Sequence, residues 1–94
     1  MYKVYQTKIF KKQLRKLDKS IKQKVEIEIE KLKQNPFLGE KLKGSLSDFS
    51  KIRIDNYRLL YRFYESPGRL DFIYLGLRKK VYSDLERLRK QEVI

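Results

Sequence analysis

The sequence predicts an α+β fold with the element order β-α-α-β-β-β-(α), in which a helical hairpin packs on one face of a small, antiparallel-rich sheet. Two patterns support this fold class. Apolar residues recur at helical spacing through the first third of the chain, and they alternate with polar residues between positions 49 and 77. A chain of 94 residues has the length of one domain and not two, so residues 1–94 are expected to form a single domain.

The first third of the chain predicts one short strand and two helices. The segment YKVYQ (2–6) alternates and places Tyr2 and Val4 on one face. Two helices joined by a tight turn follow, and Asn35-Pro36 ends the second, because proline disfavours a helical conformation in the residue before it. Each helix carries one apolar stripe that is expected to face the core: Phe10, Leu14 and Leu17 in the first, and Ile21, Val25, Ile29 and Leu32 in the second.

The remainder predicts an antiparallel meander and a final helix. Residues 37–48 contain glycines and no periodic pattern, so a loop is expected there. The segments FSKIRI (49–54), YRLLYRFY (57–64) and RLDFIYLGL (69–77) alternate and are joined by short turns, which favour antiparallel pairing. Apolar residues then return to helical spacing, and residues 78–92 are expected to form a C-terminal helix.

The first hairpin of the meander has an unusual pairing. A turn at positions 55 and 56 places Arg53 directly opposite Arg58, and like charges in that position weaken a hairpin. The same register gathers four cations on the face turned away from the helices, a face that is expected to be open. That face is predicted to carry Phe49, Lys51, Arg53, Arg58, Leu60 and Arg62.

Composition narrows the possible chemistry. The chain has 24 lysines and arginines against 12 acidic residues, a net charge of +12, and it contains neither cysteine nor histidine. Thiolate chemistry is therefore excluded, a zinc site is very unfavourable, and no cofactor is expected. There is no apolar run long enough for a membrane span and no signal-peptide pattern, so a cytoplasmic protein is the simplest interpretation.

The charge has more than one interpretation. It fits a nucleic-acid binder, but also a protein that binds an acidic partner or an anionic membrane surface. The cationic face could also be only the solvated side of a one-sided sheet. No acidic residue interrupts its cations, which favours an anion site. Arginine binds phosphate in a bidentate manner, and a lysine among arginines loses its proton more readily and is then usable as a general base.

The segments LKGSLSDFSKIRIDNYRLLYRF and YLGLRKKVY resemble the RelE/ParE superfamily of toxins from prokaryotic toxin–antitoxin modules. The helical-hairpin segment FKKQLRKLDKSIKQKVEIEIEKLKQNP resembles the first half of the same family, so the resemblance spans roughly residues 2–83. It implies a RelE-like fold. In the RelE branch it implies an mRNA interferase that cuts mRNA in the ribosomal A site without a metal, by attack of the 2′-hydroxyl on the adjacent phosphorus.

The resemblance also implies an active site. The branch's catalytic positions fall on Lys51, Arg53, Arg58, Arg78 and Tyr82. Lys51 is then the candidate base for the 2′-hydroxyl, Arg53 and Arg58 hold the scissile phosphate, Arg78 stabilises the leaving 5′-oxygen, and Tyr82 stacks on a base. For Tyr82, packing in the last helix is an equally good explanation. Auxiliary RNA contacts are expected from Arg62, Lys79 and Lys80.

Two positions depart from the pattern of many RelE-like sequences. Arg53 stands where many relatives have a second lysine, and Leu77 stands where many have a histidine before the arginine of RKKVY. Lys51 is therefore the lone lysine of the implied catalytic group, and cleavage by a histidine is excluded.

The expected partners are mRNA, the ribosome and a cognate antitoxin, acidic or amphipathic and encoded by a neighbouring gene; no membrane partner is expected. Two alternatives stay open: a ParE-like inhibitor of DNA gyrase, and a non-catalytic nucleic-acid-binding member of the fold.

Overall fold

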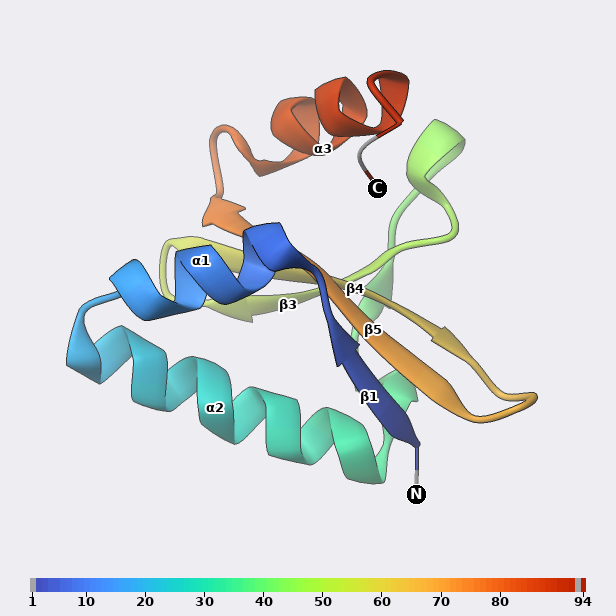
Figure 1. Cartoon of the computed structure of the whole chain (residues 1–94), viewed down its shortest axis with the longest axis horizontal. Helices are drawn as coiled ribbons and strands as arrows, with labels where there is room; N and C mark the ends of the chain where they lie inside the picture. The colour runs from blue at the N-terminus through green and yellow to red at the C-terminus, as the bar shows by residue number, and fades with distance from the viewer. Residues whose placement is uncertain (1, 93) are drawn as a thin grey trace.

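The computed structural model describes residues 2–92 and residue 94, and its elements follow the predicted order (Figure 1). Strand β1 is followed by two helices, a connection with two short 3₁₀ helices, three long strands and a last helix. The bounds are β1 Lys3–Gln6, α1 Lys8–Lys16, α2 Lys19–Gln34, η1 Pro36–Leu38, β2 Glu40–Lys41, η2 Gly44–Leu46, β3 Ser50–Ile54, β4 Tyr57–Tyr64, β5 Arg69–Leu77 and α3 Val81–Lys90. Among these helices none is long and apolar enough to cross a membrane.

The sheet has the strand order β1-β5-β4-β3-β2. The meander β3-β4-β5 is antiparallel as predicted, and β1 adds to β5 in parallel after the crossover through α1 and α2. The α+β class and the packing of a helical hairpin on an antiparallel-rich sheet are confirmed. The two-residue strand β2 was not predicted. It forms within the expected loop because its segment is held from a distance: the buried Tyr61 hydroxyl donates to the Pro36 carbonyl and accepts from the Gly39 amide.

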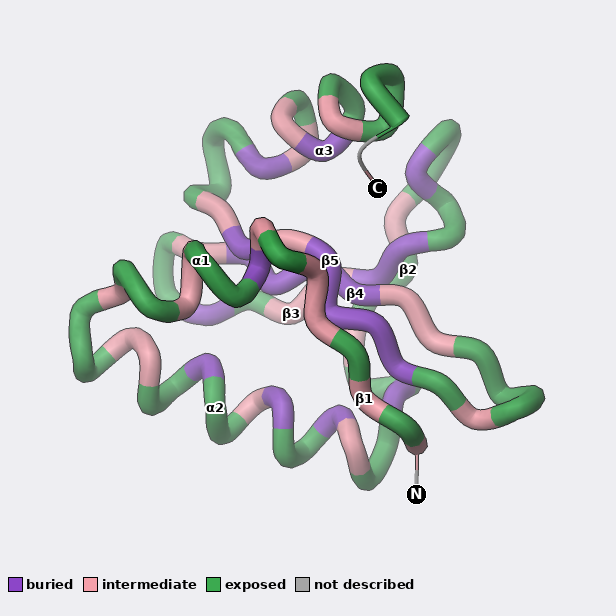
Figure 2. The backbone as a smooth tube through the Cα atoms, viewed as in Figure 1, coloured by how far each residue is buried: buried purple, intermediate pink, exposed green. Residues whose placement is uncertain are grey.

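The helical hairpin and one sheet face enclose the main core, and Figure 1 shows α2 running beneath the strands. The predicted helix stripes lie in this core. From α1 and α2, Phe10, Val25 and Leu32 are fully buried, and the ring centroid of Phe10 lies 5.7 Å from that of Phe72 in β5. The buried positions of α2 recur along the side that faces the sheet (Figure 2).

The opposite sheet face is not open, which corrects the prediction. Phe49 and Leu60, expected on a solvated face, are fully buried against Val81 and Leu85 of α3, together with Leu46 and Ile73. In Figure 1, α3 lies on the side of the sheet away from α2. The apolar stripe of the last helix needs an apolar partner, and the two apolar side chains among the cations supply one. This second core covers part of the cationic face and confines the cations to its margins.

Candidate functional site

The β3–β4 hairpin has the predicted register. Ile54 pairs with Tyr57, and Arg53 pairs with Arg58. Asp55 adopts a left-handed conformation with φ of 53°, which a two-residue hairpin turn requires and which aspartate tolerates better than most residues. The turn therefore fixes which side chains share the face that α3 partly covers.

Arg58 is the most buried of the predicted site residues, with 6% of its surface exposed. Its Nη1 donates to the carbonyl oxygens of Tyr57, at 2.8 Å, and of Asp55, at 3.1 Å. The guanidinium is thus held against the turn by the backbone. Within the described part of the chain, neither its Nε nor its Nη2 has a hydrogen-bond acceptor, so these donors can serve a ligand.

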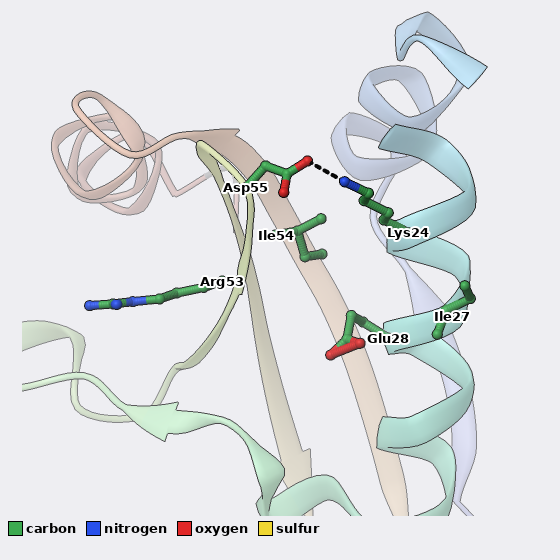
Figure 3. A pocket seen from close by; sticks show the side chains of 6 residues that line it. All are labelled: Lys24, Ile27, Glu28, Arg53, Ile54 and Asp55. Atoms are coloured by element: carbon green, nitrogen blue, oxygen red, sulfur yellow. Dashed lines mark hydrogen bonds and ion pairs between the residues drawn. The ribbon is translucent and has the colours of Figure 1, made fainter. Parts of the chain in front are cut away.

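Arg53 is exposed and points away from α2 (Figure 3). On the other side of the hairpin, Lys24 of α2 pairs with Asp55 at 2.8 Å and anchors the turn to the helix. A shallow depression of about 270 Å³ lies there, lined by Lys24, Ile27, Glu28, Arg53, Ile54 and Asp55. Two of its charged residues, Lys24 and Asp55, pair with each other, and its lining offers no cluster of one sign.

Lys51 of β3 and Tyr82 of α3, far apart in the sequence, are in contact. The Lys51 Nζ lies 5.6 Å from the centroid of the Tyr82 ring, a cation–π distance, and 3.9 Å from Oε2 of the exposed Glu40. Tyr82 reaches this position because α3 folds back over the sheet. The lysine side chain is 21% exposed, so it is partly desolvated while remaining accessible.

Arg78, Lys79 and Lys80, predicted as the first residues of the last helix, instead form an exposed cationic turn between β5 and α3, which begins at Val81. The Arg78 amide donates to the Asn56 carbonyl at 2.8 Å, which brings this turn beside the β3–β4 hairpin turn. The same residues, with Leu77, line a cavity of about 310 Å³. Arg78 and Arg58 therefore belong to neighbouring turns.

Arg62 lies apart from the other cations. It is two positions beyond Leu60 on β4, so the second core separates it from Arg58. Its guanidinium carbon lies 5.0 Å from the centroid of the Phe49 ring, and its Nη1 lies 3.6 Å from Asp48 Oδ2. These contacts give Arg62 a structural role beside any contact with RNA.

Sequence reasoning missed the residues that hold α3. Arg89 donates to both carboxylate oxygens of Asp48, at 2.7 and 3.1 Å, and to the Ser45 carbonyl. Burial disfavours ionisation of Asp48, but the hydrogen bond from Arg89 and the charges of Arg89 and Arg62 outweigh it and lower the pKa of this carboxyl. Nearer the start of the helix, the Tyr74 hydroxyl donates to Asp84. Nothing in the local sequence signals these long-range pairs.

The chemistry available here is that of fixed positive charge. Among the described residues, no three or more carboxylates lie close enough together to hold a metal ion, and the sequence has no histidine or cysteine. Arginines and a lysine around two turns can bind an anion, and they can stabilise negative charge that develops on it. The half-buried ring of Tyr82 packs against the second core, and the part of it that stays accessible beside the lysine can stack on a base.

Comparison with known proteins identifies the fold. Residues 4–86 match the family model of the ParE-like toxin of type II bacterial toxin–antitoxin systems. The structure superposes with a TM-score of 0.72 on a YoeB/ParE toxin from Agrobacterium tumefaciens, at 26% identity over 80% of this chain and 96% of that one. For the RelBE2 toxin–antitoxin complex of Mycobacterium tuberculosis the TM-score is 0.71, at 28% identity over 82% and 98%.

The isolated RelE toxin of Escherichia coli shares the fold, with a TM-score of 0.73 at 24% identity over 93% of this chain and 97% of that one. A comparison with curated protein sequences found no match. The family model covers most of the chain, and the neighbouring structures share its overall fold. The chain therefore belongs to the ParE-like toxins of type II bacterial toxin–antitoxin systems, within the RelE/ParE superfamily.

Proposed function

We propose that this toxin is a ribosome-dependent endoribonuclease that cleaves mRNA without a metal ion. The observation that supports the proposal is a cluster of cations around two neighbouring turns, to which Arg53, Arg58 and Arg78 belong. Lys51, two positions from Arg53 on β3, contacts the Tyr82 ring. The site lies in a single domain formed by residues 1–94. Such an enzyme acts in the cytoplasm, on mRNA held by a ribosome.

The reaction needs no group beyond those side chains and the RNA. Lys51 takes the proton of the 2′-hydroxyl, and the 2′-oxygen forms a bond to the adjacent phosphorus. The bond from phosphorus to the 5′-oxygen breaks, the 5′-oxygen takes up the proton that Lys51 accepted, carried back through solvent, and a 2′,3′-cyclic phosphate remains. Arg53 and the free donors of Arg58 stabilise the charge on the phosphorane, and Arg78 stabilises the leaving oxygen. Tyr82 stacks on a base next to the scissile bond.

We also propose that a cognate antitoxin neutralises this toxin. The RelBE structures that this fold resembles are complexes of a toxin with an antitoxin. A partner for a chain of net charge +12 must be acidic or amphipathic. Binding of the antitoxin is coupled to the position of α3, because this helix carries the proposed site residue Tyr82. Antitoxin should therefore alter amide hydrogen exchange at residues 82–92.

A ParE-like inhibitor of DNA gyrase is the second candidate, because the matching family model is named for the ParE-like toxins. It needs a protein-binding surface and no proton acceptor. Under that function, Lys51 and Tyr82 are not required to approach each other.

Cleavage of mRNA in a bacterial translating extract tests the proposal. Lys51→Ala and Arg78→Ala should each slow cleavage at least about 100-fold, the usual contribution of a general base or an electrostatic stabiliser. Lys11→Ala, which removes an exposed cation from α1, should cleave at the wild-type rate. Intact mRNA together with gyrase-dependent DNA breaks would favour the second candidate. Cleavage unaffected by either site variant would refute the site.

A further inference from the structure

A row of aromatic and cationic side chains crosses three strands at the far end of the sheet. Arg69 of β5 pairs with Tyr64 of β4, and its guanidinium carbon lies 6.0 Å from the Tyr64 ring centroid. On the other neighbouring strand, β1, the ring centroid of Tyr5 lies 4.6 Å from the same carbon. Arg69 is thus flanked by a tyrosine from each strand next to its own.

A buried carboxylate fixes the arginine in this row. Arg69 donates from Nε to Asp71 Oδ1 at 2.7 Å and from Nη2 to Oδ2 at 3.0 Å, and Asp71 is only 4% exposed. This bidentate pair sets the plane of the guanidinium. The Nη1 of Arg69 has no hydrogen-bond acceptor among residues 2–92, and its N–H groups point away from the Asp71 carboxylate. The arginine is therefore preorganised, with donors left for a ligand.

The two tyrosines are exposed, at 48% for Tyr5 and 43% for Tyr64. Exposing a large ring on either side of one arginine has no benefit to the isolated fold, since both tyrosines lie outside the two cores and could be polar at no loss of core packing. Lys3, also exposed, pairs with Arg69 from β1 and adds a second cation to the row. Rings, a planar guanidinium and a lysine on a strongly basic chain are the combination that holds single-stranded nucleic acid.

The row shares a sheet face with the candidate catalytic residues. Side chains alternate along β4, so Arg58, Arg62 and Tyr64 lie on one side, away from α1 and α2. Arg58 and Tyr64 are six positions apart on β4, which corresponds to about 20 Å. A single strand of a few nucleotides spans that distance.

We propose that Tyr5, Arg69 and Tyr64 form a second RNA-binding site, which stacks unpaired bases and binds the adjoining phosphate. The inference deepens the proposed function, because it assigns a platform on which RNA is held outside the cleavage site. The ligand chemistry is unpaired bases on a phosphodiester chain. Its source is either the mRNA strand that is cut or an exposed loop of ribosomal RNA.

Binding measurements on the full-length protein test this site without relying on cleavage. The probe is a fluorescent 12-nucleotide single-stranded RNA, and its anisotropy reports the dissociation constant. Tyr5→Ala and Tyr64→Ala should each weaken binding about tenfold, the contribution of one stacked base. Because neither change alters the net charge, the dependence of binding on salt should keep its slope.

Three controls separate stacking from other causes. Tyr5→Phe and Tyr64→Phe retain the ring and should bind within about twofold of the wild type. Phe37→Ala removes a ring that is 58% exposed and packs on Phe63 on the helical side of the sheet, and it should leave binding unchanged. A ribose–phosphate strand without bases should bind the Ala variants and the wild type equally.

A second assay identifies the source of the RNA, by co-sedimentation of the toxin with ribosomes that carry no mRNA. Weaker binding of the oligonucleotide by the Ala variants supports the platform with mRNA as its ligand. Unchanged oligonucleotide binding with reduced co-sedimentation supports the platform with ribosomal RNA as its ligand. If the Ala variants match the wild type in both assays, or lose no more than Phe37→Ala, the proposal is wrong. A toxin that binds RNA through this row but cleaves nothing would leave the platform standing and would refute only the nuclease.

Discussion

Arg58→Ala should destabilise the fold as well as remove activity, which distinguishes this arginine from the other proposed catalytic residues. The side chain is 6% exposed, and its Nη1 donates to two backbone carbonyls of the turn. A hydrogen bond from a charged group contributes about 1.5–3 kcal/mol. The two bonds share one donor nitrogen, and water reaches the exposed Asp55 once the arginine is gone, so we expect a loss of about 2–3 kcal/mol.

For a domain of this size, a loss of that order lowers the melting temperature by about 10–20 °C. Thermal unfolding followed by circular dichroism measures it. Lys51→Ala is the matched control, because Lys51 makes only a 3.9 Å approach to an exposed glutamate and a cation–π contact, and its variant should melt within a few degrees of the wild type. Both variants should lose mRNA cleavage at a temperature where both are folded. An Arg58→Ala protein that melts with the wild type would refute the structural half of this reasoning.

Three further changes test the supports of the site. Asp48→Asn should remove part of the pH dependence of folding stability. Because the pKa of Asp48 is lowered in the fold, its pairing with Arg89 stabilises the protein above the unfolded pKa, which is near 4. This stabilisation is lost as the pH falls through the folded pKa. Acid unfolding curves of the variant and the wild type should then converge at low pH, and parallel curves would contradict this. Leu85→Ala, at a fully buried position, should cost about 2–5 kcal/mol and raise hydrogen exchange in α3 more than in α2. Arg53→Gln removes the cation opposite Arg58 and should raise stability by about 0.2–1 kcal/mol while slowing mRNA cleavage, whereas a fall in the denaturation midpoint would show that the pair is not repulsive.

Local patterns were sufficient for the main helices and strands, though not for β2, and for one register. The alternation between positions 49 and 77, interrupted by a two-residue turn, fixes β3 opposite β4, because a shift by one residue would move every apolar side chain to the wrong face. The same logic placed Phe10 and the stripe of α2 in the core. The resemblance to the RelE/ParE superfamily is confirmed by the family match, while the roles it implies for individual residues stay predictions.

The arrangement of α3 could not be obtained in this way. Its apolar stripe predicts that the helix packs against something, but not that Phe49 and Leu60 are what it covers. The pairing of Asp48 with Arg89 joins residues 41 positions apart, and the proximity of Lys51 to Tyr82 depends on the same docking. Contacts of this kind are fixed by the tertiary fold, and no spacing in the sequence encodes them.

The opposed arginines of the hairpin show how a local violation can indicate a site. Arg58 folds onto the turn carbonyls and Arg53 extends into solvent, so the repulsion in the free protein is small but not removed. If stability alone mattered, an acidic residue at position 53 would replace the repulsion by attraction. Retaining two cations makes sense when an anion occupies the position between them, because the same two charges then attract one ligand, and binding to the folded state alone stabilises it. Under the proposed function, this rule of strand pairing is broken at the point where RNA binds, so the state that function requires is the complex rather than the free chain.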